Sequence, residues 1–381
     1  MSDQIRTRLD RGAEKREPAP DSEGVTFFRL TEKDDRNLLE QLLARQPDCE
    51  IHDTLYAQLG ELVKIRHAHI PADALDKDHK IQLLLNGRST HECGVWVYYP
   101  WSNRLVHLLD EDEFIELRTS RNLYKITREE QALLRTKKIG VIGLSVGMTI
   151  AMCLAMERVC GEIRIADFDT LDLSNLNRLE AGVHELGIPK WRIALRRIAE
   201  LDPYLKVRVF KQGVTEENIN DFLTENGKLD VLVDECDSLD IKLLCRARAR
   251  DLQIPVVMDT NDRGMLDIER FDLEPERALL HGLVGELDHT QLRQLSALEK
   301  LPVVMKMISA ENISERLRYS MGEYGKTIVS WPQLSSAVFL GGAIATEACR
   351  QILLNQSKLS GRFYFDIGHV INQTNLERNA Q

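Results

Sequence analysis

The chain has 381 residues, a formal net charge of −10 and a charged fraction of 29%. This length predicts two or three domains, and the hydrophobic fraction of 43% is ordinary for a globular protein with buried cores. The sequence has no apolar run of the ~18–20 residues that a membrane span needs, and its charged N-terminus lacks an apolar signal segment, which argues against a membrane or secreted protein. The acidic balance argues against broad nucleic-acid binding, because phosphate contacts need clustered Lys and Arg.

The cysteines and histidines give no clear metal or disulfide pattern. Seven cysteines are scattered along the chain and none forms a C-x-x-C pair, which predicts reduced, mostly buried thiols in a cytoplasmic protein. His67 and His69 are the closest pair of histidines, and no cysteine or acid near them completes a ligand set. We therefore expect no zinc.

The N-terminal third is predicted to be separate from the rest. Residues 1–24 are charged and contain two prolines, which is typical of a mobile tail, and residues 25–117 are predicted to form a smaller α+β domain with two strands near its end. Aromatic residues are concentrated at these strands. Core packing is the default interpretation of such aromatics, and a substrate-recognition groove is the alternative. The aromatic residues are Trp96, Tyr98, Tyr99 and Trp101.

The stretch 137–178 predicts a β-turn-α-β unit. A buried strand leads into a glycine turn that includes Gly143, Ser145 and Gly147, an apolar helix follows, and a second strand ends at Asp167. Free N–H groups and the dipole at a helix N-terminus favour a phosphate. Asp167 lies 24 residues after Gly143, where an acid accepts ribose hydroxyls. The turn is one residue shorter than G-x-G-x-x-G, so alone it is weak evidence for a nucleotide.

More polar residues follow at the places where an open α/β sheet binds ligands. Asn175 and Arg178 share a face if a helical turn begins at Ser174, which is a common first residue of a helix. Lys190 opens the next helix, and Asp237 follows a predicted strand. Together they supply cations for a polyphosphate and an acid for Mg²⁺, which a dehydrogenase does not need. A NAD-binding oxidoreductase built on the same unit remains an alternative.

The remaining elements predict an α/β fold with a Rossmann-like, mostly parallel sheet and helices on both faces. A lead-in helix is expected over 118–135, and a long apolar helix over 337–354. The strands that extend the sheet are predicted at 206–210, 230–234 and 254–258, with 264–273 returning antiparallel and 363–367 as the last strand.

Four motifs in this order resemble those of the E1-like adenylyltransferases, the group of ThiF, MoeB and the ubiquitin-activating enzymes. The motifs are R-x-x-R at 118–121, D-F-D-x-x-x-L-S-N-L-x-R at 167–178, G-x-P-K at 187–190 and D-x-x-D at 234–237. The resemblance implies an adenylation domain over 118–381, with a variable crossover segment at about 275–330, and ATP and Mg²⁺ as cofactors.

The resemblance also implies roles for single residues. Arg178 and Lys190 would neutralise the triphosphate, Asp237 would hold Mg²⁺, and Asn175 would donate to a phosphoryl oxygen. Arg121 would reach the ATP of the partner subunit, which implies a homodimer.

The crossover segment has no cysteine, since none occurs between Cys245 and Cys349. Enzymes that capture an acyl adenylate on themselves need a thiolate there. We therefore expect activation of a carboxylate, on a peptide or small molecule, with capture by a nucleophile of the substrate. The alternatives are activation of a sulfur-carrier or ubiquitin-like protein, a tRNA-modification cyclase, which the acidic charge disfavours, and a non-catalytic nucleotide-binding scaffold.

Overall fold

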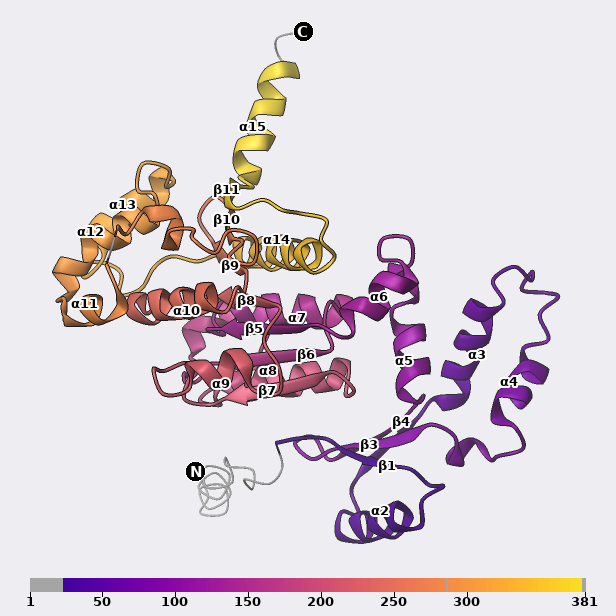
Figure 1. The fold of residues 1–381 in the computed structure, drawn as a ribbon. Helices are drawn as coiled ribbons and strands as arrows, with labels where there is room; N and C mark the ends of the chain where they lie inside the picture. The colour runs from indigo at the N-terminus through magenta and orange to yellow at the C-terminus, as the bar shows by residue number, and fades with distance from the viewer. Residues whose placement is uncertain (1–22, 286, 379–381) are drawn as a thin grey trace, which may run out of the picture. The chain divides into compact units, whose positions relative to one another are not determined.

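The computed structural model describes residues 23–285 and 287–378 in two compact units (Figure 1). The first unit runs to Lys125 and takes in Asp202–Tyr204, and the second contains the rest of the chain. The sequence predicted a domain boundary between residues 117 and 118. The predicted tail, 1–24, falls almost entirely outside the described ranges. Among the helices that the structure describes, none is long and apolar enough to span a bilayer.

The first unit is built on a four-stranded sheet with the order β1-β3-β4-β2. Its strands are β1 (Thr26–Phe28), β2 (Glu50–Asp53), β3 (Val95–Tyr99) and β4 (Arg104–Leu108), and its helices are α2 (Lys33–Arg45), α3 (Leu55–Arg66), α4 (Lys77–Leu85) and α5 (Glu111–Arg118). Successive side chains of a strand point to opposite faces. Accordingly, Trp96 and Tyr98 pack in one cluster and Tyr99 in another, and all three are buried. These three aromatics are core residues, whereas Trp101 is only partly buried.

The predicted lead-in helix over 118–135 is wrong, because the chain breaks it into pieces. Helix α5 ends at Arg118, a 3₁₀ turn η2 (Ser120–Asn122) follows, and α6 covers only Arg128–Leu134. Tyr124 has φ of +71°, which no helix accommodates. Thr127 then starts a new helix, since its side chain accepts a hydrogen bond from the Glu130 N–H.

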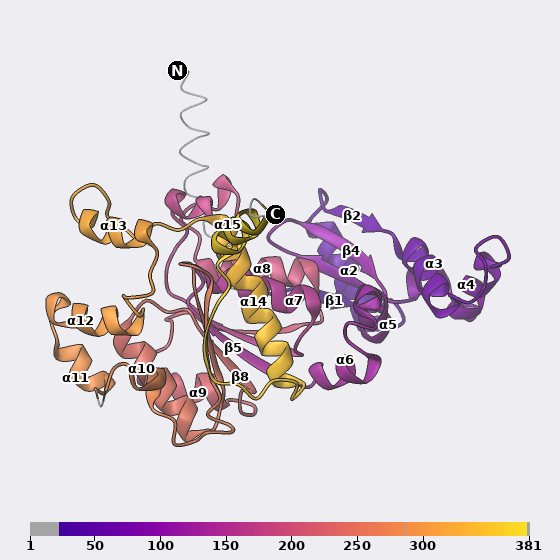
Figure 2. The same cartoon turned by 90° about the horizontal axis from the view of Figure 1, so that it is seen from above.

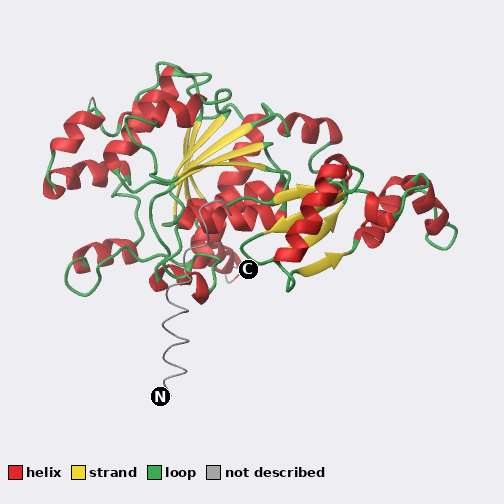
Figure 3. Ribbon diagram, turned by 90° about the horizontal axis from the view of Figure 1, so that it is seen from below, coloured by secondary structure: helices red, strands yellow, loops and turns green. Residues whose placement is uncertain are grey.

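The second unit contains a seven-stranded sheet with the order β11-β10-β9-β8-β5-β6-β7. Its strands are β5 (Lys138–Ile142), β6 (Glu162–Ala166), β7 (Lys206–Phe210), β8 (Val231–Asp234), β9 (Val256–Thr260), β10 (Met265–Glu269) and β11 (Gly361–Tyr364). The five strands from β9 to β7 are parallel, and β10 and β11 are antiparallel additions at one edge. The predicted α/β class with a mostly parallel sheet is confirmed (Figure 3).

Helices cover both faces of this sheet, because the central strands are apolar on both sides. Ile139 and Val141 pack in a cluster with residues of α7, α8 and α14, whereas Ile142 packs with residues of α9 and α10 (Figure 2). The bounds are α7 (Gly147–Glu157), α8 (Lys190–Leu201), α9 (Ile219–Thr224), α10 (Leu239–Asp251) and α14 (Ser335–Leu353).

The segment between β10 and α14 is helical and adds a small core of its own against α10. Its elements are the 3₁₀ turn η5 (Leu279–Gly282) and the helices α11 (His289–Gln294), α12 (Ala297–Met307) and α13 (Glu315–Glu323). Helix α15 (Ile367–Arg378) ends the described chain.

Candidate functional site

The glycine turn at the end of β5 is held close to the end of β8. Gly143 has φ of +83°, and a Cβ on it would lie 2.6 Å from the Glu235 carbonyl oxygen. Only glycine fits such a conformation and approach without strain. Helix α7 starts at Gly147, so the turn leads straight into a helix N-terminus whose free N–H groups favour an anion.

Asp167 fastens this turn to the end of β6. One carboxylate oxygen accepts from the Leu144 N–H at 2.6 Å, and the other accepts from the Asp169 N–H at 2.7 Å. The side chain is only 7% exposed, and this burial raises its pKa while the two N–H groups oppose the rise. Each carboxylate oxygen keeps a second lone pair, which a ribose hydroxyl can use.

Lys190 begins α8 and is paired with Asp169. Its Nζ lies 2.9 Å from Asp169 Oδ2, and its backbone N–H donates to the Asp169 carbonyl at 2.9 Å. Lys190 is buried, whereas the Asp169 carboxylate is exposed. The sequence predicted that Lys190 is a cation for phosphate and assigned Asp169 no role in the site. The structure instead shows an ion pair beside the turn that Asp167 fastens.

Arg178 lies across the glycine turn and bonds only neutral oxygens within the described residues. Its guanidinium donates to Ser145 Oγ at 3.0 Å, to Asn177 Oδ1 at 2.9 Å and, more weakly, to the Ser174 carbonyl at 3.5 Å. The Arg178 Nε is buried without an acceptor there. Burial lowers the pKa of Arg178, and the charge of Asp237 opposes this. The site therefore holds a partly desolvated cation next to a helix N-terminus.

Asn175 lies in the 3₁₀ turn η3 (Leu173–Asn177), which follows Asp172 instead of opening at Ser174 as predicted, and Arg178 comes directly after the turn. It is buried, and its Oδ1 accepts from the Asp172 N–H at 3.1 Å. The backbone N–H of Arg178 donates to the Asn175 carbonyl at 3.0 Å. Asn175 thus shapes the loop that carries Arg178 in addition to any contact with a ligand.

The two acids of the D-x-x-D motif have different surroundings. Asp234 is fully buried, and its carboxylate pairs with the guanidinium of Arg246 and with Lys242 Nζ at 3.2 Å. Arg246 in turn pairs with Glu269 at 2.7 Å. Asp237 is exposed. Asp234 is therefore part of a buried ion-pair network that fixes the end of β8, while Asp237 is free to meet a cation.

An acid pair next to the glycine turn was not singled out from the sequence: Asp259, which is buried, and Glu235, which is partly buried. The Asp259 N–H on β9 donates to Glu235 Oε1 at 2.7 Å, and both Asp259 carboxylate oxygens are buried without a hydrogen-bond partner among the described residues. Burial raises the pKa of Asp259 to about 7 and raises that of Glu235 well above its usual value. One signal was available, since each acid directly ends or follows an apolar strand.

The thiols of the second unit are poorly suited to nucleophilic capture. Cys245 and Cys349 are fully buried, and burial raises the pKa of each, to about 12 for Cys349. Cys236 is only partly buried, but burial and the neighbouring Asp234 raise its pKa as well. Thiolate formation at these positions is disfavoured at neutral pH.

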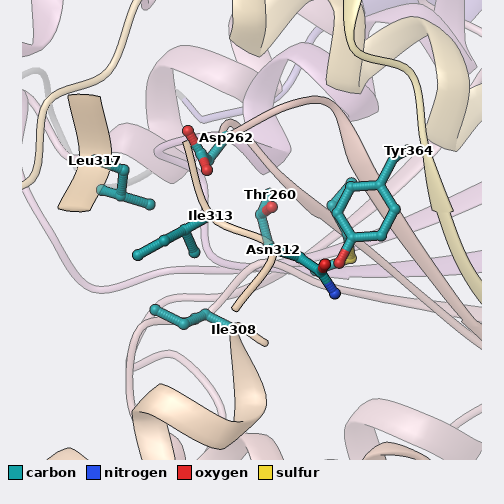
Figure 4. A pocket seen from close by; sticks show the side chains of 8 residues that line it. Thr260, Asp262, Ile308, Asn312, Ile313, Leu317 and Tyr364 are labelled. Atoms are coloured by element: carbon teal, nitrogen blue, oxygen red, sulfur yellow. The ribbon is translucent and has the colours of Figure 1, made fainter. Parts of the chain in front are cut away.

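A small cavity of about 50 Å³ lies beyond the end of β9 (Figure 4). Asp262 at its rim accepts from the Ser314 N–H at 2.8 Å and so anchors the start of α13. Thr260, Asn312 and Tyr364 supply further polar groups, and the rest of the lining is apolar. A volume of this size holds a few water molecules, so the cavity is too small for a peptide or nucleotide.

The predicted residues fall into two groups. Arg121 is exposed on η2 in the first unit. All others lie in the second unit, where hydrogen bonds and charge interactions connect most of them around the glycine turn. These others are Gly143, Ser145, Gly147, Asp167, Asn175, Arg178, Lys190 and Asp237.

Comparison with known proteins matches residues 118–370 to the model of the ThiF family. An uncharacterised protein of Mycobacterium tuberculosis is 39% identical over 352 residues, which cover 92% of this chain and 46% of that protein. The chain therefore spans about half the length of this relative. The Bacillus subtilis tRNA threonylcarbamoyladenosine dehydratase is 26% identical over 63% of this chain and 97% of its own. A crystal structure of the E. coli enzyme of that name with ATP has a TM-score of 0.46 and 17% identity, over 65% of this chain and 98% of that one.

Proposed function

Because this chain belongs to the ThiF family, we propose that it is an ATP-dependent adenylyltransferase that activates a substrate carboxylate as an acyl adenylate. One observation carries the proposal. Arg178 is a partly desolvated cation that bonds only neutral oxygens among the described residues, beside the N-terminus of α7. Such a group is stabilised by an anion, and a nucleotide polyphosphate supplies one.

The main requirement of the reaction is neutralisation of the negative charge on the phosphates. A carboxylate oxygen attacks the α-phosphorus of ATP, the bond to the β-phosphate oxygen breaks, and pyrophosphate leaves. Acceleration comes from positioning and from neutralising the phosphate charge. In this proposal Arg178 and the N–H groups at Gly147 bind phosphate, Asp167 accepts the ribose hydroxyls, and Lys190 exchanges its bond to Asp169 for a phosphate oxygen.

The exposed acid Asp237 fits a bound Mg²⁺, because carboxylate oxygens are its preferred protein ligands and the site brings phosphates nearby. When bound, Mg²⁺ neutralises phosphate charge. Asp234 is unsuited to this role, since its carboxylate is already paired with Arg246 and Lys242.

Capture of the adenylate falls to the substrate in this proposal. The crossover segment 275–330 contains no cysteine, and burial raises the pKa of the thiols at Cys236, Cys245 and Cys349. A nucleophile of the substrate, such as an amine or amide nitrogen, then attacks the acyl carbon and AMP leaves, which gives cyclisation or condensation.

A peptide or a small molecule is the substrate class that the charge supports. A chain with a net charge of −10 is poorly suited to bind a large polyanion such as tRNA. A tRNA base modification is the second candidate, because the Bacillus subtilis relative is a tRNA threonylcarbamoyladenosine dehydratase and this chain covers 97% of it. Activity that survives treatment with ribonuclease favours the first class.

The proposed enzyme is a homodimer in which Arg121 serves the partner's site. The exposure of Arg121 on η2 supports this. Mixing an Arg121→Ala protein with an Asp237→Ala protein should then restore part of the activity that each has lost, because one site of the mixed dimer is complete. No recovery in verified mixed dimers counts against action in trans.

Exchange of labelled pyrophosphate into ATP tests the proposed activity. We expect exchange that depends on Mg²⁺ and on an added carboxylate substrate, with pooled short peptides as the first probe. Exchange should survive in the Cys236→Ala, Cys245→Ala and Cys349→Ala variants. An acyl or sulfur group found on one of these cysteines during turnover refutes capture by the substrate.

A further inference from the structure

A histidine–carboxylate cluster lies in the first unit, far from the adenylation chemistry in the chain. It consists of Asp53 at the end of β2, His91 in the 3₁₀ turn η1 (Thr90–Glu92) and His107 in β4. One ligand atom from each residue lies within 4.8 Å of the others. Asp53 and His107 are direct partners in the parallel pairing of β2 with β4, so their side chains stand next to each other on one face of the sheet.

The two ring nitrogens of His107 both face oxygen atoms that accept hydrogen bonds. Nε2 lies 2.7 Å from the Cys93 carbonyl, and Nδ1 lies 2.9 Å from Asp53 Oδ1. A carbonyl can only accept, so Nε2 carries the proton. In the neutral ring Nδ1 then presents a lone pair to a carboxylate, which is repulsive unless a proton or a metal ion lies between them. His107 is fully buried, so water does not relieve this contact.

The arrangement around His107 has the features of a metal ligand. A ligating histidine donates its other N–H to a backbone carbonyl, which fixes the tautomer and the ring orientation, and Cys93 supplies that carbonyl here. The ring also stacks on Trp96, with centroids 4.0 Å apart and planes 9° apart. The imidazole is therefore held in place before any ion binds.

His91 completes the set from the solvent side. Its Nδ1 lies 3.4 Å from Asp53 Oδ2, and its side chain is 70% exposed. With metal–ligand bonds of ~2.0–2.1 Å, two ligand atoms at the corners of a tetrahedron are roughly 3.4 Å apart. The distance from His91 Nδ1 to Asp53 Oδ2 has this value. The 2.9 Å distance from His107 Nδ1 is to the other oxygen, Oδ1, so the side chains need a small shift before one carboxylate oxygen binds an ion together with both rings. The exposed side leaves room for a water ligand.

We propose that Asp53, His91 and His107 bind a divalent transition-metal ion, with Zn²⁺ as the best match to two imidazoles, a carboxylate and a water. Mg²⁺ and Ca²⁺ are poor matches because they prefer oxygen ligands. The ion would join β2, a four-residue edge strand with every residue exposed, to β4 and to the turn before β3. Its role would be to stabilise the first unit, and the proposal is independent of the adenylation chemistry.

The sequence alone predicts no zinc, because the ligands are spread over three segments. Asp53 and His107 are 54 positions apart, so no short spacing links them. The close pair His67 and His69, which the sequence does single out, lies at the end of α3, with ring centroids 6.2 Å apart. This pair gives a matched control, since it offers two histidines without the buried, oriented member.

The test uses the full chain, stripped with a chelator and titrated with Zn²⁺ by calorimetry. We expect one saturable site per chain, a higher unfolding temperature with Zn²⁺, and visible absorption of tetrahedral Co²⁺ when Co²⁺ replaces it. His91→Ala changes an exposed side chain, so the variant should fold, and it should weaken Zn²⁺ binding by roughly tenfold or more. Asp53→Asn keeps the shape of the side chain and should do the same.

The double variant His67→Ala/His69→Ala should bind Zn²⁺ like the wild type. Three results overturn the proposal. The first is that the wild type shows no saturable Zn²⁺ binding. The second is that the His91→Ala chain binds Zn²⁺ as tightly as the wild type, and the third is that the His67→Ala/His69→Ala control loses Zn²⁺ binding. In each case the cluster is a histidine–carboxylate contact that binds no ion.

Discussion

Replacing Arg178 with methionine separates ligand binding from fold stability. In the proposed ATP complex the substitution would remove about two guanidinium contacts to phosphate, each worth about 1.5–3 kcal/mol. The loss is offset in part because the bonds to Ser145 and Asn177 no longer have to be given up. A net loss of about 2–4 kcal/mol corresponds to a roughly 30-fold to 1,000-fold weaker affinity for ATP. The folded chain loses neutral hydrogen bonds but no longer buries an unpaired charge, so its stability should change by only about 1 kcal/mol.

Calorimetric titration with ATP–Mg²⁺ and urea unfolding measure the two effects. Arg248→Met is the matched control, because Arg248 lies on α10 in the same unit and is about half-exposed beside Asp251. This control should leave both ATP affinity and stability near the wild-type values. ATP affinity that is unchanged in Arg178→Met, or a loss of affinity that merely follows a large loss of stability, refutes the reasoning.

Three further predictions concern the same region. Gly143→Ala should lower the free energy of unfolding, measured in urea, by roughly 1–3 kcal/mol more than Gly187→Ala. Both glycines have φ near +82°, but only at Gly143 would the added Cβ clash with a backbone oxygen, that of Glu235. Equal losses of stability contradict this close packing. Burial raises the pKa of Asp259 to about 7 from 3.8, so the native chain keeps a proton that the unfolded chain releases, and the free energy of unfolding should fall as pH rises from about 4 to about 7. Asp259→Asn should flatten this fall, and an unchanged slope argues against a protonated pair. Mass spectrometry of the chain, quenched during turnover, should find Cys236 unmodified, because burial raises the pKa of that thiol; an acyl adduct on Cys236 contradicts capture by the substrate.

The sheet and the glycine turn were predictable because their determinants are local. An apolar run, a glycine and a second apolar run are read directly from 139–166, and the predicted strand β5, helix α7 and strand β6 are confirmed. The predicted helix over 118–135 failed, because a positive φ at Tyr124 and a capping box at Thr127 interrupted a pattern that looked continuous.

The pairings across the sheet could not be predicted, since they depend on which strand ends meet. Glu235 and Asp259 come together only because β8 and β9 are neighbours. The ion pair of Lys190 with Asp169 depends on how α8 returns to the end of β6. A single sequence gives the residue types at these ends but not their partners.

Parallel calorimetric titrations of the full chain with ATP–Mg²⁺ and with NAD⁺ test the central claim most directly. The account predicts one saturable ATP site per chain, weakened in Arg178→Met, and no saturable binding of NAD⁺. Saturable binding of NAD⁺ without binding of ATP would contradict it, because the account assigns Arg178 to the triphosphate and the exposed acid Asp237 to Mg²⁺, and NAD⁺ binding requires neither role.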